Sequence, residues 1–363
     1  MKLPRPHSLS AYMEFSKLKS VAKYNLATSG IMNCSLADLD FSLADLELHG
    51  PNNYGYAPLR EAIARMKGVG PESVVHAEGT SMANHLAMSA LFAPGDEVLI
   101  EEPTYELLLS TALYLGAKVR RFQRRSEENY ALDREEVSKQ LTPRTRLIVL
   151  TNMHNPSSVL AGEEQIGAIG ALAGSVGARV LVDEVYLELL HHPQVPSSIH
   201  YGHQFVVTSS LTKAYGLSGL RCGWILAEPE LAKQIWRLND VFGATPVHIA
   251  ERLSTLAIEQ VDKLARRADA LLEANRKALV ETLSGHPEID LNIPPVGTTV
   301  FPRLRQGKVA GFCEFLRDKY ETSVVPGVYF ERPEHFRVGI PGETEMTREG
   351  LIRLAAALHS WKG

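Results

Sequence analysis

The sequence at residues 209–224 reads SSLTKAYGLSGLRCGW, and it sets one lysine, Lys213, among hydroxyl-bearing and glycine residues. An apolar run at 205–207 precedes it and predicts a buried strand, so we expect Lys213 in a loop at the carboxyl end of that strand. Such loops are where α/β proteins bind ligands. A desolvated lysine loses proton affinity, and its free amine can then attack a carbonyl carbon.

The neighbours of Lys213 suit a phosphate group. Ser210 can donate a hydroxyl hydrogen bond, Arg221 can bind a phosphate through two donors, and Gly223 allows close approach of the backbone. A ligand with both an aldehyde and a phosphate would use all of these groups, and pyridoxal phosphate is the cofactor that has both. Taken alone, the segment fits a solvated loop lysine about as well, because short motifs often match by chance.

Composition and charge narrow the class of protein. The chain has 363 residues, 45% of them hydrophobic and 22% charged, which is typical of a globular protein with two domains or one large domain and a smaller companion. A formal net charge of -4 argues against a nucleic-acid partner, because phosphate backbones are bound through a positive excess. The one basic run, at 120–125, is expected to be a solvated edge strand.

The cysteine pattern indicates a reducing compartment. Cys34, Cys222 and Cys313 are widely spaced and odd in number, which excludes a disulfide framework and a zinc ribbon, and we expect a cytoplasmic protein. We find no run of eighteen apolar residues, so neither membrane insertion nor secretion is expected. No metal site is expected either, since the adjacent His191 and His192 would face apart on a regular element.

The pattern Ser-x-x-Lys at 210–213, followed by Gly-x-Arg-x-Gly at 219–223, resembles the cofactor-lysine signature of the class I and II aminotransferases. These are pyridoxal-phosphate-dependent enzymes of fold type I. The resemblance implies a three-layer α/β/α large domain with a mostly parallel sheet and a smaller α+β domain. We expect an N-terminal segment at 1–45 that belongs to the small domain, a cofactor-binding large domain at 46–240, and a C-terminal small domain at 241–363.

Three segments are implied to hold the cofactor phosphate and ring. Gly79, Thr80 and Ser81 form a glycine turn that opens a predicted helix, where free amides favour an anion, and the resemblance assigns the phosphate to them together with Ser210 and Arg221. Ordinary N-capping is the alternative explanation of this turn. Tyr105 follows a predicted strand and is implied to stack on the pyridine ring; a core tyrosine would look the same.

Two further strands are predicted to end in cofactor contacts. Asn155 follows the strand at 146–152 and is implied to donate to the phenolic oxygen, although Ser158 stands where the family usually has glycine. Asp183 follows the strand at 178–182, where a carboxylate can pair with a protonated pyridine nitrogen; a metal ligand or a helix cap is the alternative. Tyr186 is implied to donate to the phenolic oxygen beside Asn155.

The substrate contacts are implied by resemblance alone. Ser29 and Gly30 end an extended segment that lines the carboxylate pocket in the family, and Arg337 matches the arginine that holds the α-carboxylate with Asn155 nearby. Without the other motifs, Arg337 could equally form a surface ion pair. A homodimer is implied as well, although Gly50 stands where many members have a tyrosine that reaches the neighbouring subunit.

The implied reaction is transfer of the amino group of an L-amino acid to a 2-oxo acid, with Lys213 covalently bound to the cofactor aldehyde and, once freed, acting as general base. Asp183 and Tyr186 complete the catalytic set. A lyase or a cyclase is the alternative. Residues 28–30, together with the segment at 213–217, also resemble the branch that contains capreomycidine synthase.

Overall fold

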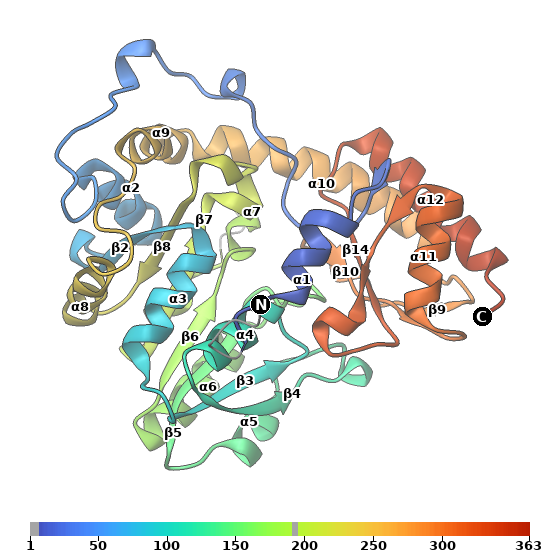
Figure 1. Cartoon of the computed structure of the whole chain (residues 1–363), viewed down its shortest axis with the longest axis horizontal. Coiled ribbons are helices and arrows are strands. Elements are labelled where there is room, and N and C mark those ends of the chain that lie inside the picture. The colour runs from blue at the N-terminus through green and yellow to red at the C-terminus, as the bar shows by residue number, and fades with distance from the viewer. Residues whose placement is uncertain (1–6, 191–194) are drawn as a thin grey trace.

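A computed structural model describes residues 7–190 and 195–363, so His191 and His192 lie outside it. Its centre is a seven-stranded sheet in the order β2-β8-β7-β6-β5-β3-β4 (Figure 1). Only the two pairings made by β8 are antiparallel, which confirms the mostly parallel sheet expected from the sequence. The strands are β2 (Val74–Glu78), β3 (Glu97–Glu102), β4 (Lys118–Gln123), β5 (Thr145–Thr151), β6 (Arg179–Asp183), β7 (Phe205–Ser210) and β8 (Cys222–Leu226).

Helices cover both faces of this sheet because its inner strands are apolar on both sides. On β5, Ile148 belongs to one core cluster and Leu147 to the other, as the two-residue repeat of a strand requires. Helix α6 packs in the first cluster and α3 in the second, so the three-layer arrangement is confirmed. The helices of this part are α2 (Ala57–Lys67), α3 (Gly79–Leu91), α4 (Glu106–Tyr114), α5 (Arg134–Gln140), α6 (Glu163–Val176), α7 (Leu211–Tyr215), α8 (Pro229–Asn239) and α9 (His248–Glu259).

The long helix α10 (Val261–Leu283) leads from α9 to a smaller α+β unit (Figure 1). That unit contains the antiparallel sheet β10-β14-β13, and its short N-terminal strand β1 pairs with β12. The domain boundaries expected after residues 45 and 240 remain predictions. No helix in the described part of the chain combines the length and apolar character needed to cross a membrane. The remaining elements are β1 (Tyr24–Asn25), β9 (Ile289–Asp290), β10 (Thr299–Val300), β11 (Arg303–Leu304), α11 (Val309–Tyr320), β12 (Thr322–Ser323), β13 (Val325–Pro326), β14 (Phe336–Gly339) and α12 (Thr344–Ser360).

The N-terminal helix is shorter and less regular than its sequence pattern suggests. The helical spacing of the apolar residues Tyr12, Phe15, Leu18 and Val21 predicts one amphipathic helix over residues 10 to about 23. In the structure, the α-helix α1 (Ala11–Glu14) continues as a π-helical turn that ends at Lys19. The wider turn breaks the apolar stripe. Phe15 is therefore buried, whereas Leu18 and Val21 are 71% and 72% exposed.

The basic run at 120–125 is only partly what its sequence suggests. Strand β4 is indeed the edge of the sheet, but the expectation of solvated side chains is wrong for two of its arginines. Arg121 forms an ion pair with Glu331, and Arg124 is fully buried against Glu101. A buried carboxylate on the neighbouring strand β3 explains the second case, because it offers the guanidinium a partner inside the protein.

Candidate active site

A cavity of about 210 Å³ opens where β5, β6 and β7 end, at the carboxyl edge of the parallel strands. The cavity brings together most of the residues predicted from the sequence. They are Ser29, Thr80, Ser81, Tyr105, Asn155, Asp183, Tyr186, Ser210, Lys213 and Arg221. Thr212, another hydroxyl residue of the lysine segment, lines it too, whereas the sequence did not predict the contributions of Tyr12, Met13, Ser16, Asn84, Thr151 and Val185.

Lys213 lies in the short helix α7 and not in the loop that we expected. The helix starts directly after β7, where the Ser210 hydroxyl accepts from the Thr212 amide at 3.3 Å. It ends at Gly216, whose φ of +70° and contact with the Met32 carbonyl leave no room for a side chain. The lysine is therefore held in a single tight turn.

The amine of Lys213 meets a pair of hydroxyl groups. Its Nζ lies 3.4 Å from the Ser29 Oγ, which also accepts a 2.7 Å hydrogen bond from the Tyr186 hydroxyl. A Cβ on Gly30 would lie 3.1 Å from the Lys213 Cδ, so a glycine leaves the lysine stem its space. The structure thus joins the predicted substrate segment to the predicted catalytic residues through the bond from Tyr186 to Ser29, while donation by Tyr186 to the cofactor's phenolic oxygen stays a prediction.

Asp183 is held by two donors at the end of β6. Its carboxylate accepts from the Asn84 side chain at 2.8 Å and from the Val185 amide at 3.1 Å, while Thr208 donates to Asn84 at 2.6 Å and so fixes the amide orientation. Burial raises the pKa of Asp183 to about 6, against the opposing effects of Asn84, Val185 and Lys213. Asn84 lies on α3, and nothing in the sequence indicates that this polar helix residue faces the cavity.

We expect Asp183→Asn to change how the cofactor-free protein responds to pH. Because the pKa rises from 3.8 to about 6 on folding, the native state binds the proton more tightly, and wild-type stability should fall as the pH rises from 4 through 6. The loss is about 3 kcal/mol at most. Urea unfolding at pH 4.5 and pH 8 should therefore show Asp183→Asn gaining on the wild type at the higher pH; an equal difference at both pH values would contradict the shift.

An anion cradle lies at the start of α3. Gly79 has a φ of +77°, and a Cβ there would lie 2.3 Å from the Arg221 Nη2. A Cβ on Gly223 would lie 2.5 Å from the Gly79 carbonyl carbon, so the start of α3 and the segment at 221–223 approach each other closely. The Thr80 hydroxyl donates to the Ser210 hydroxyl at 2.8 Å. Helix-start amides, two hydroxyls and a guanidinium fit a phosphate.

Gly79→Ala should weaken pyridoxal phosphate binding about 10- to 100-fold, because a left-handed alanine costs roughly 1–2 kcal/mol and its methyl group displaces the guanidinium. Fluorescence titration with the cofactor measures the change. Gly219→Ala is the matched control, since a Cβ there meets nothing within 4 Å. Equal dissociation constants for the two variants would show that the cradle does not hold the phosphate.

Arg337 is buried and has no carboxylate partner in the described part of the chain, so it does not form the surface ion pair that was its alternative. Its Nη1 donates to Asn155 Oδ1 at 3.0 Å, and its Nη2 donates to the Tyr12 hydroxyl and to the Ala27 carbonyl, each at 3.1 Å. Its buried Nε has no hydrogen-bond partner among the described residues. An orphaned guanidinium donor fits a carboxylate ligand.

Two tyrosines form one wall of the cavity. The Tyr105 ring, predicted to stack on the cofactor, meets the Tyr12 ring edge to face, with centroids 5.5 Å apart. Burial opposes ionisation of the Tyr12 phenol, but the charges of Arg337 and Lys213 outweigh it and lower the pKa. Tyr12 therefore belongs to the site although it lies 325 residues from Arg337.

Ser158, which departs from the family's usual glycine, keeps a glycine-like backbone. Its φ is +61°, and its hydroxyl bonds to Thr299 Oγ1 at 2.9 Å. A left-handed serine is unfavourable, and this hydrogen bond helps to offset the cost. The turn that carries Asn155 is thereby tied to β10 of the smaller unit.

Comparison with known proteins places these features in a family. The sequence matches the family described as aminotransferase class I and II over residues 40–355. It is 29% identical to capreomycidine synthase of Streptomyces vinaceus, covering 93% of this chain and 90% of the relative. It is 27% identical to arginine–pyruvate transaminase of Pseudomonas aeruginosa, covering 90% and 89%.

A solved structure gives the same picture. A PLP-dependent aminotransferase from Streptococcus suis superposes with a TM-score of 0.90 at 26% identity, covering 100% of both chains. The family match spans most of this chain, and the cradle, the buried carboxylate and the lysine together fit the family's cofactor. The chain therefore belongs to the class I and II aminotransferase family, whose cofactor is pyridoxal phosphate.

Proposed function

We propose that the protein is an aminotransferase that moves the amino group of an L-amino acid to a 2-oxo acid. One observation carries the proposal: Lys213 and Asp183 line one cavity, and the buried Arg337 guanidinium donates to two other residues of its wall, Asn155 and Tyr12. Their chemistry supports binding of a cofactor ring through the carboxylate and of a substrate carboxylate through the guanidinium. The same arrangement favours proton transfer at the carbon between them.

Each residue then has a distinct task. Bound pyridoxal phosphate supplies an electron-withdrawing ring. Asp183 keeps a proton on the ring nitrogen, and Arg337 orients the α-carboxylate through its free donor. Lys213 accepts and returns the substrate proton, while the Ser29 hydroxyl, held by Tyr186, fixes the position of the amine. The phosphate would be held by the anion cradle, which consists of Gly79, Thr80, Ser81, Ser210 and Arg221. Tyr105 would pack against the ring.

A cyclase or lyase is the second candidate, supported by the similarity to capreomycidine synthase. Both reaction types begin with loss of the α-proton to Lys213, so the residues described above serve either one. The difference lies in the fate of the amino group: transamination leaves it on the cofactor, whereas a cyclase keeps it in the product and a lyase keeps it there or releases it as ammonia.

Single-turnover mixing separates the two candidates. Purified protein loaded with pyridoxal phosphate is mixed with a panel of L-amino acids that includes arginine, without any 2-oxo acid. Transamination predicts that the cofactor absorbance moves to that of its amino form, that one equivalent of 2-oxo acid appears, and that added pyruvate or 2-oxoglutarate reverses the change. Release of ammonia or of a cyclised product, with no amino form for any amino acid, would reject transamination.

We further propose a cytoplasmic homodimer. Exposed apolar side chains support the dimer: Leu48 is 77% exposed, and Val241 and Val247 are 77% and 56% exposed on a second segment. The Asn52 side chain ties the two segments together by donating to the Pro246 carbonyl at 2.8 Å. Light scattering should give twice the 40.0 kDa chain mass, and a mass equal to that of one chain would contradict the dimer.

The cytoplasmic location is supported by the three cysteines, which are all free, as expected in a reducing compartment.

A further inference from the structure

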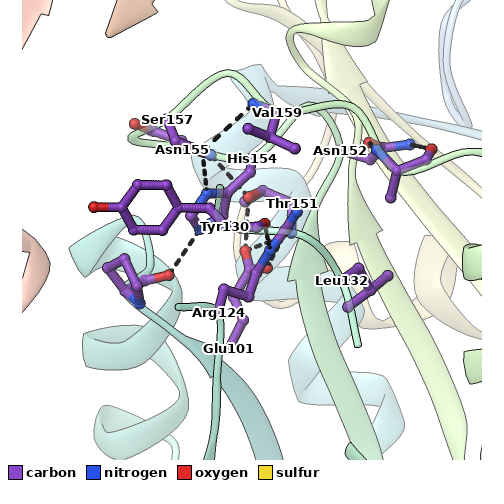
Figure 2. Close-up of polar contacts among 12 residues, drawn as sticks. Glu101, Arg124, Tyr130, Leu132, Thr151, Asn152, His154, Asn155, Ser157 and Val159 are labelled. Atoms are coloured by element: carbon purple, nitrogen blue, oxygen red, sulfur yellow. Dashed lines mark hydrogen bonds and ion pairs between the residues drawn. The ribbon is translucent and has the colours of Figure 1, made fainter. Parts of the chain in front are cut away.

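A buried ion pair is hydrogen-bonded to Thr151, which lines the cavity together with Asn155 (Figure 2). Glu101 lies on β3 and Arg124 directly follows β4; neither side chain is exposed to solvent, and Oε2 lies 2.9 Å from Nη1. The Arg124 Nε also donates to the Tyr130 carbonyl at 2.7 Å. Arg124 belongs to the basic run whose side chains were expected to be solvated, and the pair has no part in the proposed chemistry.

The second oxygen of Glu101 faces Thr151. Its Oε1 accepts from the Thr151 amide at 2.7 Å and from the Thr151 hydroxyl at 2.6 Å. The same hydroxyl oxygen accepts a hydrogen bond from the Asn155 amide at 3.0 Å. A continuous chain of short hydrogen bonds therefore joins the ion pair to the backbone of Asn155, as the dashed lines in Figure 2 show.

Asn155 is held from the other side by Arg337. Its Oδ1 accepts from the Arg337 Nη1 at 3.0 Å, which leaves the side-chain nitrogen as the donor available to a ligand in the cavity that Asn155 lines. The direction of that donor depends on where the backbone of the turn sits. The backbone in turn depends on Thr151.

Stability alone does not account for the pair. Taking both charges out of water often costs more than their attraction returns, and apolar residues in their place are often as stable. Burial raises the pKa of Glu101 even with Arg124 and Thr151 beside it. What apolar residues could not supply is an acceptor for the amide and hydroxyl of Thr151.

We propose that Glu101 is a positioning residue that acts through Thr151 to aim the Asn155 side chain at the bound cofactor, and that Arg124 neutralises the buried carboxylate without aiming Asn155 itself. Arg124 fixes one carboxylate oxygen of Glu101, and the other oxygen fixes Thr151. The inference rests on the proposed function, because the contact between Asn155 and the cofactor's phenolic oxygen is part of it.

Two double variants separate positioning from a merely structural role. Glu101→Gln with Arg124→Met removes the ion pair but keeps an amide oxygen that can accept from Thr151. Glu101→Met with Arg124→Met removes both the pair and the acceptor. The two proteins differ only at residue 101, by an amide against a thioether of similar size. Thermal unfolding of both checks that they fold.

The readout is the pH titration of the absorbance of bound pyridoxal phosphate, which needs no substrate. A hydrogen bond donated to the phenolic oxygen favours the deprotonated cofactor, so its loss should raise the midpoint by about one pH unit. We expect this rise for Asn155→Ala and for Glu101→Met/Arg124→Met, and a midpoint close to that of the wild type for Glu101→Gln/Arg124→Met. Adding the Met pair to Asn155→Ala should cause no further rise, because both act on the same contact.

The outcomes distinguish this inference from the proposed function. A wild type that binds no pyridoxal phosphate, or that titrates like Asn155→Ala, would contradict the proposed role of Asn155. Two results would overturn the positioning inference while the function stands, provided that the wild type and Asn155→Ala differ as expected. One is an equal midpoint for Glu101→Met/Arg124→Met and Glu101→Gln/Arg124→Met. The other is a further rise of about one pH unit when Glu101→Met/Arg124→Met is added to Asn155→Ala. Should the Met pair fail to fold, Thr151→Val tests the same hydroxyl: the expected rise supports the inference and an unchanged midpoint overturns it.

Discussion

Lys213→Ala should lose at least about 10⁴-fold of the turnover while keeping its fold and its affinity for the phosphate of the cofactor. The amine is the one amino group that lines the cavity in the described part of the chain, so its loss removes both the covalent attachment and the proton acceptor. Among the described residues, its Nζ makes a single hydrogen bond, the 3.4 Å approach to Ser29, so the fold should tolerate its removal. Single-turnover absorbance and borohydride reduction followed by mass spectrometry measure the two losses.

Lys233→Ala is the control for this substitution, because Lys233 lies on the solvent side of α8 and outside the cavity. It should leave turnover and reduction unchanged. A Lys213→Ala protein that still retained cofactor on the chain after borohydride treatment would show that another residue forms the covalent bond.

The sheet and most of the cofactor site could be predicted because their signals are local. Buried strands read as apolar runs, and in a parallel sheet the residues that follow them must meet at one edge. Asp183, Asn155 and Lys213 each follow such a run directly, so their convergence follows from topology. Helices α6 and α10 can be located from the sequence for a similar reason, because each has a sustained helical repeat of apolar residues.

The missed residues lack a local signal. Asn84 looks like an ordinary polar helix position, and only its bonds to Asp183 and Thr208 give it a role. Arg124 sits in a run of charges that reads as surface, and its burial depends on a carboxylate supplied by a neighbouring strand. Tyr12 reaches the site through the packing of the N-terminal helix. Contacts of this kind are fixed by tertiary structure and have no periodicity of their own.

Arg337→Lys should lower kcat/KM for the amino acid substrate about 10²- to 10³-fold, mainly through KM, and leave the affinity for pyridoxal phosphate nearly unchanged. A lysine keeps the positive charge, but it cannot donate to Asn155, Tyr12 and a carboxylate in the fixed directions of a guanidinium. The buried Nε that now lacks a partner is the donor whose loss the substrate should feel most. Steady-state kinetics and cofactor titration on the same preparation give both numbers.

Arg305→Lys controls for the general effect of an arginine-to-lysine change, since Arg305 is about half exposed and pairs with Asp290 away from the cavity. The pattern expected for Arg337→Lys is the reverse of that for Gly79→Ala. Arg337→Lys should mainly raise KM for the amino acid, whereas Gly79→Ala should mainly lower the affinity for the cofactor. This opposition follows from geometry, because the phosphate cradle at α3 and the carboxylate donor at β14 belong to different elements of the cavity wall. A rise in KM for Arg305→Lys as large as that for Arg337→Lys, or a loss of cofactor affinity in Arg337→Lys with KM unchanged, would place the substrate carboxylate elsewhere.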